Sequence, residues 1–180
     1  MQYLKIPEER IAILIGERGC TKKEIEDRTG TKIGIEETSV TVESSRGNSM
    51  EELIAANIVL AIGRGFNPEI ALKLMQDDHT LEVLHLHDYA NTPKSYERIK
   101  SRVIGEKGKC RKNIEELSGA YISVYGKTIA ILGSYDDMAL AKEAVLMLID
   151  GARHASVYRL LEKTKAARRD APWSGEIPKI

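Results

Sequence analysis

One short glycine motif occurs twice in this chain, at a fixed offset. The stretches Gly16-Glu17-Arg18-Gly19 and Gly105-Glu106-Lys107-Gly108 lie 89 positions apart, and an isoleucine precedes each of them. The same offset carries five further residues onto identical ones, Lys23, Ile25, Glu26, Gly30 and Ile33 recurring as Lys112, Ile114, Glu115, Gly119 and Ile122. Because the match includes a helix stop and alternating apolar positions, it indicates an internal duplication. A chain of 180 residues can form two small domains, and we expect two.

Both halves predict the same order of elements: strand, helix, helix, strand, strand, helix. In the first half we expect a strand at 2–6, helices at 8–15 and 21–29, strands at 31–35 and 39–42, and a helix from Asn48 or Ser49 to about residue 62. In the second half we expect a strand at 82–87, helices at 95–104 and 111–117, and a hairpin with Ile129 and Ile131 inward. A short helix at 68–75 links the halves. These elements predict an α+β fold with domains at 1–78 and 79–168, the second with an extended C-terminal helix, and a tail at 169–180.

A G-x-x-G loop between two helices suits contact with a nucleic-acid backbone. Glycines remove Cβ atoms where a sugar-phosphate strand must pass closely, and they allow N–H groups to meet phosphate oxygens. Any tight turn between helices can also use glycine for a positive φ, so a single copy would decide little. Two copies within matching patterns favour nucleic-acid binding.

The charge distribution favours the second half as the partner of a polyanion. The net charge is zero, which argues against strong non-specific binding of nucleic acid. Residues 1–78 carry 10 Lys/Arg and 14 Asp/Glu, whereas residues 79–180 carry 17 and 13. Around the second loop, residues 94–113 hold eight basic side chains against two acidic ones, while residues 5–24 hold five against four. The basic run at 153–170 reads as a solvated helix face, with phosphate contact as the alternative.

Both halves resemble KH domains of type I, whose signature I-G-x-x-G appears as Ile15–Gly19 and Ile104–Gly108. The stretches 61–69, 121–128 and 151–158 are further similar to the archaeal two-KH-domain proteins of pre-ribosome assembly. That family is the counterpart of the eukaryotic partner-of-Nob rRNA-processing factor, and the resemblance covers nearly the whole chain. The two loops of this chain differ from many KH loops at Glu17 and Glu106, where basic residues are common.

The resemblance implies a fold and a set of partners. Each domain is expected to have a three-stranded sheet packed by helices on one face. The implied ligand is single-stranded RNA, near the 3′ end of the small-subunit ribosomal RNA during its maturation. The implied protein partners are the rRNA-processing endonuclease and the alpha subunit of initiation factor two.

The KH mechanism assigns roles to particular residues, because such modules clamp about four nucleotides by their backbone and turn the bases toward an apolar groove. The expected RNA-binding residues are, in the second domain, Ile104, Gly105, Glu106, Lys107, Gly108, Lys109, Arg111, Lys112, Ile114, Ile122 and Tyr125, and in the first, Gly16, Glu17, Arg18, Gly19, Lys22 and Lys23. Ile104, Ile114 and Ile122 are expected to line the apolar floor. Tyr121 and Tyr125 share a strand face and either stack on bases or remain simply exposed. Arg64 is expected to end a helix, with RNA contact as the minority alternative.

No catalytic pattern stands out, and we expect neither enzymatic activity nor a cofactor. The second loop lacks the spacing and the hydroxyl of a nucleotide-phosphate loop. His85 and His87 share a face of the predicted strand near Asp88, which leaves a metal-dependent nuclease as a distant alternative. A protein-interaction scaffold with weak RNA binding is the nearer one.

The remaining composition indicates a cytoplasmic protein away from membranes. No apolar run approaches the roughly 18 residues of a membrane span, and Met1–Lys5 lacks the start of a secretory signal. Cys20 and Cys110 have neither zinc nor disulfide spacing, so we expect small buried residues at helix starts. Trp173 could dock on this chain or on a partner.

Overall fold

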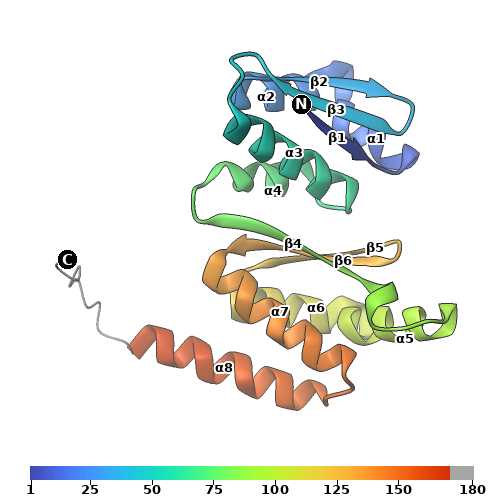
Figure 1. The fold of residues 1–180 in the computed structure, drawn as a ribbon. Helices are drawn as coiled ribbons and strands as arrows, with labels where there is room; N and C mark the ends of the chain where they lie inside the picture. The colour runs from blue at the N-terminus through green and yellow to red at the C-terminus, as the bar shows by residue number, and fades with distance from the viewer. Residues whose placement is uncertain (171–180) are drawn as a thin grey trace.

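The computed structural model describes residues 1–170 and contains two copies of one α+β unit (Figure 1). The first unit consists of β1 (Gln2–Lys5), α1 (Glu8–Ile15), α2 (Cys20–Thr29), β2 (Thr31–Glu36), β3 (Ser39–Ser44) and α3 (Ser49–Gly63). A short α4 (Pro68–Ala71) and a 3-10 turn at Leu72–Met75 lead into the second unit. That unit consists of β4 (His79–His85), α5 (Pro93–Ile104), α6 (Lys109–Ser118), β5 (Tyr121–Tyr125), β6 (Thr128–Ser134), α7 (Tyr135–Ile149) and α8 (His154–Asp170). The predicted fold class is confirmed.

Local side chains set the helix ends. The Asn48 side chain accepts a hydrogen bond from the Met50 N–H at 3.0 Å and caps α3, as the sequence predicts. Thr92 caps α5 by accepting from the Ser95 N–H at 3.2 Å. Gly30 and Gly119 end α2 and α6 in the left-handed conformation, which glycine adopts without a Cβ clash.

Each unit has its own antiparallel three-stranded sheet, in the order β1-β3-β2 and β4-β6-β5. The third strand in sequence, β3 or β6, lies in the centre of each sheet, so β2 and β5 are both edge strands. Ile33 pairs with Val42 in the first sheet, and Ile122 pairs with Ile131 in the second. The two sheets remain separate and do not form one platform.

The second sheet is covered on both faces, which adds a layer beyond the one-sided packing expected. Helices α5, α6 and α7 cover one face, and α3 and α4 of the first unit lie between the two sheets (Figure 1). Ala130 and Leu132 of β6 belong to the same apolar cluster as Ile58 and Phe66. All four residues of the run 129–132 have no exposed surface, as expected for a strand buried on both sides.

Two stretches of the second unit differ from expectation. Strand β4 begins three residues earlier than predicted and ends at His85, after which Leu86–Asp88 forms a 3-10 turn. The C-terminal helix is not an extension of α7, because the chain turns at Gly151, whose φ is 97°. Helix α8 then packs back through the fully buried Val157 and Leu161. Trp173 and most of the predicted tail lie outside the described residues.

Candidate nucleic-acid interface

The two glycine loops have the same backbone conformation. Gly16 and Gly105 have φ values of 73° and 72°, and the Gly19 and Gly108 N–H groups donate to the carbonyl oxygens of Gly16 and Gly105 at 3.3 and 3.2 Å. The third residue of each loop adopts positive φ without being glycine, at 52° for Arg18 and 51° for Lys107. The duplicated sequence therefore builds a duplicated tight turn between two helices.

The two glycines of each loop have different reasons to be there. A Cβ added at Gly105 would lie 2.5 Å from the Cys110 Cβ and 2.8 Å from the Cys110 backbone nitrogen, so the start of α6 forbids a side chain. A Cβ at Gly108 would meet no atom within 4 Å. Gly16 and Gly19 repeat this contrast. The first glycine thus closes the turn, while the second leaves open space on the surface.

Of the three isoleucines that the sequence suggests for the apolar floor of the second domain, only Ile104 is exposed. Ile15 and Ile104, which end α1 and α5, are each 37% exposed. Ile114 and Ile122 were expected on the same floor, but they are 0% and 2% exposed. Both belong to the buried core of the second unit, so neither is exposed beside the loop, and their contact with RNA stays a prediction. Val124, two residues further along β5, is only partly buried and packs against the same core.

The cations around the second loop divide into free and engaged groups. Lys94, Arg98, Lys107, Lys109 and Lys112 are exposed and form no ion pair with the side chains described, those of residues 1–168. Arg102 is engaged, because its guanidinium donates to the carbonyl oxygens of Leu148 and Ala152. Arg111 is partly buried beside Glu115. The free lysines leave the second loop with a positive surface.

The first loop carries fewer cations at equivalent positions. Cys20 stands where the second domain has Lys109, and it is exposed rather than buried as expected, because its side chain lies on the outer side of the α2 start. Cys110 is buried as expected, and burial raises the pKa of its thiol. Lys23 is exposed, and Lys22 approaches Glu26 at 3.9 Å.

Tyr125 does not face the groove but the first domain. Its hydroxyl donates a hydrogen bond to Glu9, and the Arg10 guanidinium lies 5.8 Å from the centre of its ring. Tyr121 lies on the same strand face, with the Lys73 ammonium 5.5 Å from its ring centre. In this arrangement α1 of the first unit contacts Tyr125, and the assignment of Tyr125 to RNA stays a prediction. The connection after α3 also contacts this face of β5, because Ser123 Oγ donates to the Arg64 carbonyl oxygen at 2.8 Å.

Sequence reasoning missed one pair of residues in the interface. Glu26 and Glu115 each accept a hydrogen bond, through Oε1, from the backbone N–H of Ile33 or Ile122 on the edge strand. Both bonds measure 2.8 Å. The signal was available in the 89-residue offset, which matches both glutamates and both isoleucines.

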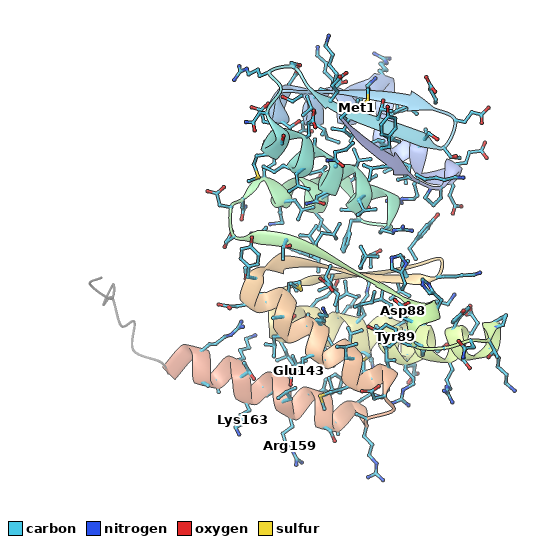
Figure 2. All side chains as sticks on the ribbon, in the orientation of Figure 1. Met1, Asp88, Tyr89, Glu143, Arg159 and Lys163 are labelled. Atoms are coloured by element: carbon cyan, nitrogen blue, oxygen red, sulfur yellow. The ribbon has the colours of Figure 1, made fainter. Side chains whose placement is uncertain are left out.

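The metal-site alternative finds no support in the described residues. His85 ends β4 and His87 lies in the following turn, so the two do not share a strand face; their ring centres are 5.3 Å apart. His87 Nε2 lies 3.0 Å from the carboxylate of Asp88, which lies in the turn after β4 (Figure 2). Within residues 1–170, no group of three or more His, Cys, Asp and Glu side chains is arranged to hold a metal ion.

The order of elements, the sheet topology and the two glycine loops define a protein with two type I KH domains. Family models agree: one described as "Eukaryotic type KH-domain (KH-domain type I)" matches residues 80–166, and one described as "KH domain" matches residues 1–56.

Similar proteins narrow the class. The chain is 46% identical to the KH domain-containing protein MJ0443 of Methanocaldococcus jannaschii, over 92% of this chain and 74% of that protein. It is 27% identical to the pre-rRNA-processing protein PNO1 of Chaetomium thermophilum, over 79% of this chain and 56% of that protein. A solved a/eIF2alpha-aDim2p-rRNA complex from Pyrococcus horikoshii contains a similar chain, with 46% identity, a TM-score of 0.86, and coverage of 92% of this chain and 94% of that one. The chain belongs to the archaeal two-KH-domain family related to PNO1 and Dim2p.

Proposed function

We propose that this chain binds single-stranded RNA with both glycine loops, and that the second loop contributes more of the affinity. This proposal rests mainly on the two turns of matching backbone conformation, each with open space at its second glycine. The exposed lysines beside the second loop supply phosphate contacts. The first loop has fewer such lysines. The matched family models describe KH domains, which bind nucleic acid, and neither describes a catalytic domain.

The proposed RNA is small-subunit ribosomal RNA near its 3′ end, bound in the cytoplasm while the pre-ribosome matures. Support comes from two relatives, one described as a pre-rRNA-processing protein and one solved in a complex with rRNA. The proposed protein partners are the alpha subunit of initiation factor two, which is present in that complex, and the rRNA-processing endonuclease. A separate finding concerns the membrane: no helix in the described residues is both long and apolar enough to span one.

The test compares matched loop variants in binding to a short single-stranded RNA by fluorescence anisotropy. In one variant both variable residues of the second loop become Asp (Glu106→Asp with Lys107→Asp), and in the other those of the first loop do (Glu17→Asp with Arg18→Asp). Asp tolerates the left-handed conformation, so both variants keep the turn. We expect the second-loop variant to lose at least about tenfold in affinity and to show a shallower salt dependence, because one phosphate contact is removed. A larger loss from the first-loop variant would overturn the assignment.

A protein-interaction scaffold with weak RNA binding is the second candidate, and one observation favours it. The groove of the first domain beside Ile15 is lined by Glu8 and Glu37, together with the aliphatic Ile11 and Ala12. At the 89-residue offset, Glu8 corresponds to Glu97 in the second domain, but Glu37 corresponds to Gly126, and Ile11 and Thr38 correspond to Lys100 and Lys127. If neither loop variant changed RNA affinity while binding of the initiation-factor subunit persisted, the scaffold would be the better description.

A further inference from the structure

The carboxylates of Glu26 and Glu115 occupy the same place in the two domains. Each lies on the second helix of its domain and accepts from the N–H of the isoleucine on the adjacent edge strand at 2.8 Å. Each also has a cation one helical turn before it, with Lys22 Nζ and Arg111 Nε both 3.9 Å from a carboxylate oxygen. Their exposed fractions are 25% and 23%. The hydrogen-bond length, the cation distance and the exposed fraction therefore agree closely between the two copies.

This contact changes what the edge strand can offer to a base. An unpaired edge normally presents alternating N–H donors and carbonyl acceptors. Here the glutamate consumes the N–H of Ile33 or Ile122, while the carbonyl oxygen of the same residue points to the same side of an antiparallel strand. The carboxylate itself adds acceptor lone pairs and no donor. At this one residue of each edge strand, the cap therefore leaves acceptors in place of a donor and an acceptor.

The two glutamates line clefts of different size. Glu26 lines an open cleft of about 760 Å³ together with Lys22, Ile33 and Gly34. Glu115 lines a cleft of about 320 Å³, which is narrower because Gly65, Phe66 and Asn67 of the first domain form its opposite wall. A group bound beside Glu115 is therefore more confined than one bound beside Glu26.

We propose that Glu26 and Glu115 determine base preference in the two clefts that they line, by accepting hydrogen bonds from exocyclic amino groups. This inference rests on the proposed RNA binding. Cytosine places an amino group where uracil has the carbonyl oxygen O4, and the two pyrimidines are otherwise alike in size. Cytosine is accepted at the strand edge, whereas uracil sets an oxygen against a carboxylate and a carbonyl. The discrimination is stronger at Glu115, because its cleft leaves less room for uracil to shift.

The experiment measures the affinity of the full chain for oligocytidine and oligouridine of equal length, at neutral pH. We expect cytidine to bind at least about tenfold more tightly, in line with one good side-chain contact to a base edge. The informative variants are Glu115→Gln and Glu26→Gln, singly and together. Glutamine still accepts from the isoleucine N–H through its oxygen, so the strand edge stays capped, while its NH₂ group can donate to uracil O4. The cytidine-to-uridine ratio should fall toward one in the double variant, and Glu115→Gln should account for most of the fall.

Glu116→Gln and Glu24→Gln are the matched controls, because both remove one negative charge at exposed positions of the same helices. They should raise affinity for both oligonucleotides slightly and leave the ratio unchanged. A native chain that binds both oligonucleotides equally, or a ratio that survives in the double variant, would overturn the role of the carboxylates but not the proposed RNA binding. A native chain that binds no single-stranded RNA would overturn this role together with the proposed function.

Discussion

The hydroxyl of Tyr125 in the second KH domain donates a hydrogen bond to the carboxylate of Glu9 in the first, 116 positions away. The Arg10 guanidinium lies over the same ring and also donates to the carbonyl oxygens of Ile62 and Phe66. Burial lowers the pKa of Arg10, which the neighbouring Tyr125 and Glu9 partly oppose. These contacts join α1, the end of α3 and β5, so they fix one domain against the other beside the narrow cleft.

A double-mutant cycle measures this inter-domain contact. Tyr125→Phe and Glu9→Gln should each lower the free energy of unfolding modestly, and their effects should not add. We expect a coupling energy of about 1 kcal/mol, the usual net value of one hydrogen bond. Urea denaturation of the four proteins provides the measurement. Strict additivity would show that the contact does not hold the domains.

The two glycines of the second loop should respond differently to alanine. Gly105→Ala meets the Cys110 backbone and a conformation with φ of 72° and ψ of 179°, so we expect a loss of about 3 kcal/mol or more in stability. Gly108→Ala meets no neighbour and should cost about 1 kcal/mol from its left-handed backbone. Thermal denaturation gives both values. Equal destabilisation would contradict the division of roles between the two positions.

Arg102 and Arg98 belong to the same basic stretch, but replacing Arg102 should lower stability, whereas replacing Arg98 should leave stability nearly unchanged. Arg102→Ala leaves the Leu148 and Ala152 carbonyl oxygens without their guanidinium donor, which should destabilise the fold by about 2 kcal/mol. Arg98→Ala removes an exposed side chain and should change stability by less than about 0.5 kcal/mol. Urea midpoints and RNA affinity separate the two. A stability loss from Arg98→Ala that matched Arg102→Ala would refute this distinction.

Tyr158 on α8 should make the protein sensitive to alkaline pH. Burial raises the pKa of Tyr158 to about 12 from an ordinary value of 10, and a hydrogen bond with Cys110 contributes to the rise. The folded state therefore keeps the phenol protonated to a higher pH than the unfolded chain does. Its stabilising effect is complete below pH 10 and is lost as the pH rises through 12. Urea midpoints across this window should fall less steeply in Tyr158→Phe than in the native chain.

The sequence predicted the parts of this structure that depend on local signals. Gly30 and Gly119 as helix stops, Asn48 as a cap, and both glycine loops were recognisable because backbone conformation restricts which residues can stand there. The duplication at a constant offset then predicted the order of elements in the second domain from that in the first. Even the two-sided burial of β6 had a signal, since 129–132 is an unbroken apolar run.

The parts that depend on packing between elements were not predictable in the same way. Alternation shows that Tyr121 and Tyr125 share a face, but not that α1 and the α3–α4 connection of another domain cover it. Ile114 and Ile122 were placed in the groove because the pattern marks apolar positions without saying which are accessible. The Glu26 and Glu115 caps join a helix to a strand seven residues later. The 89-residue offset marks the matching residues, but the hydrogen bond between them is seen only in the folded geometry.

Photo-crosslinking of the full chain to single-stranded RNA, with the linked peptides identified by mass spectrometry, tests the central claim most directly. The two-loop arrangement predicts linked peptides that contain residues 104–112 and 122–127 in greatest yield, with weaker links at 15–23. Links confined to α8, or to the outer face of the first sheet, would contradict RNA binding through the glycine loops.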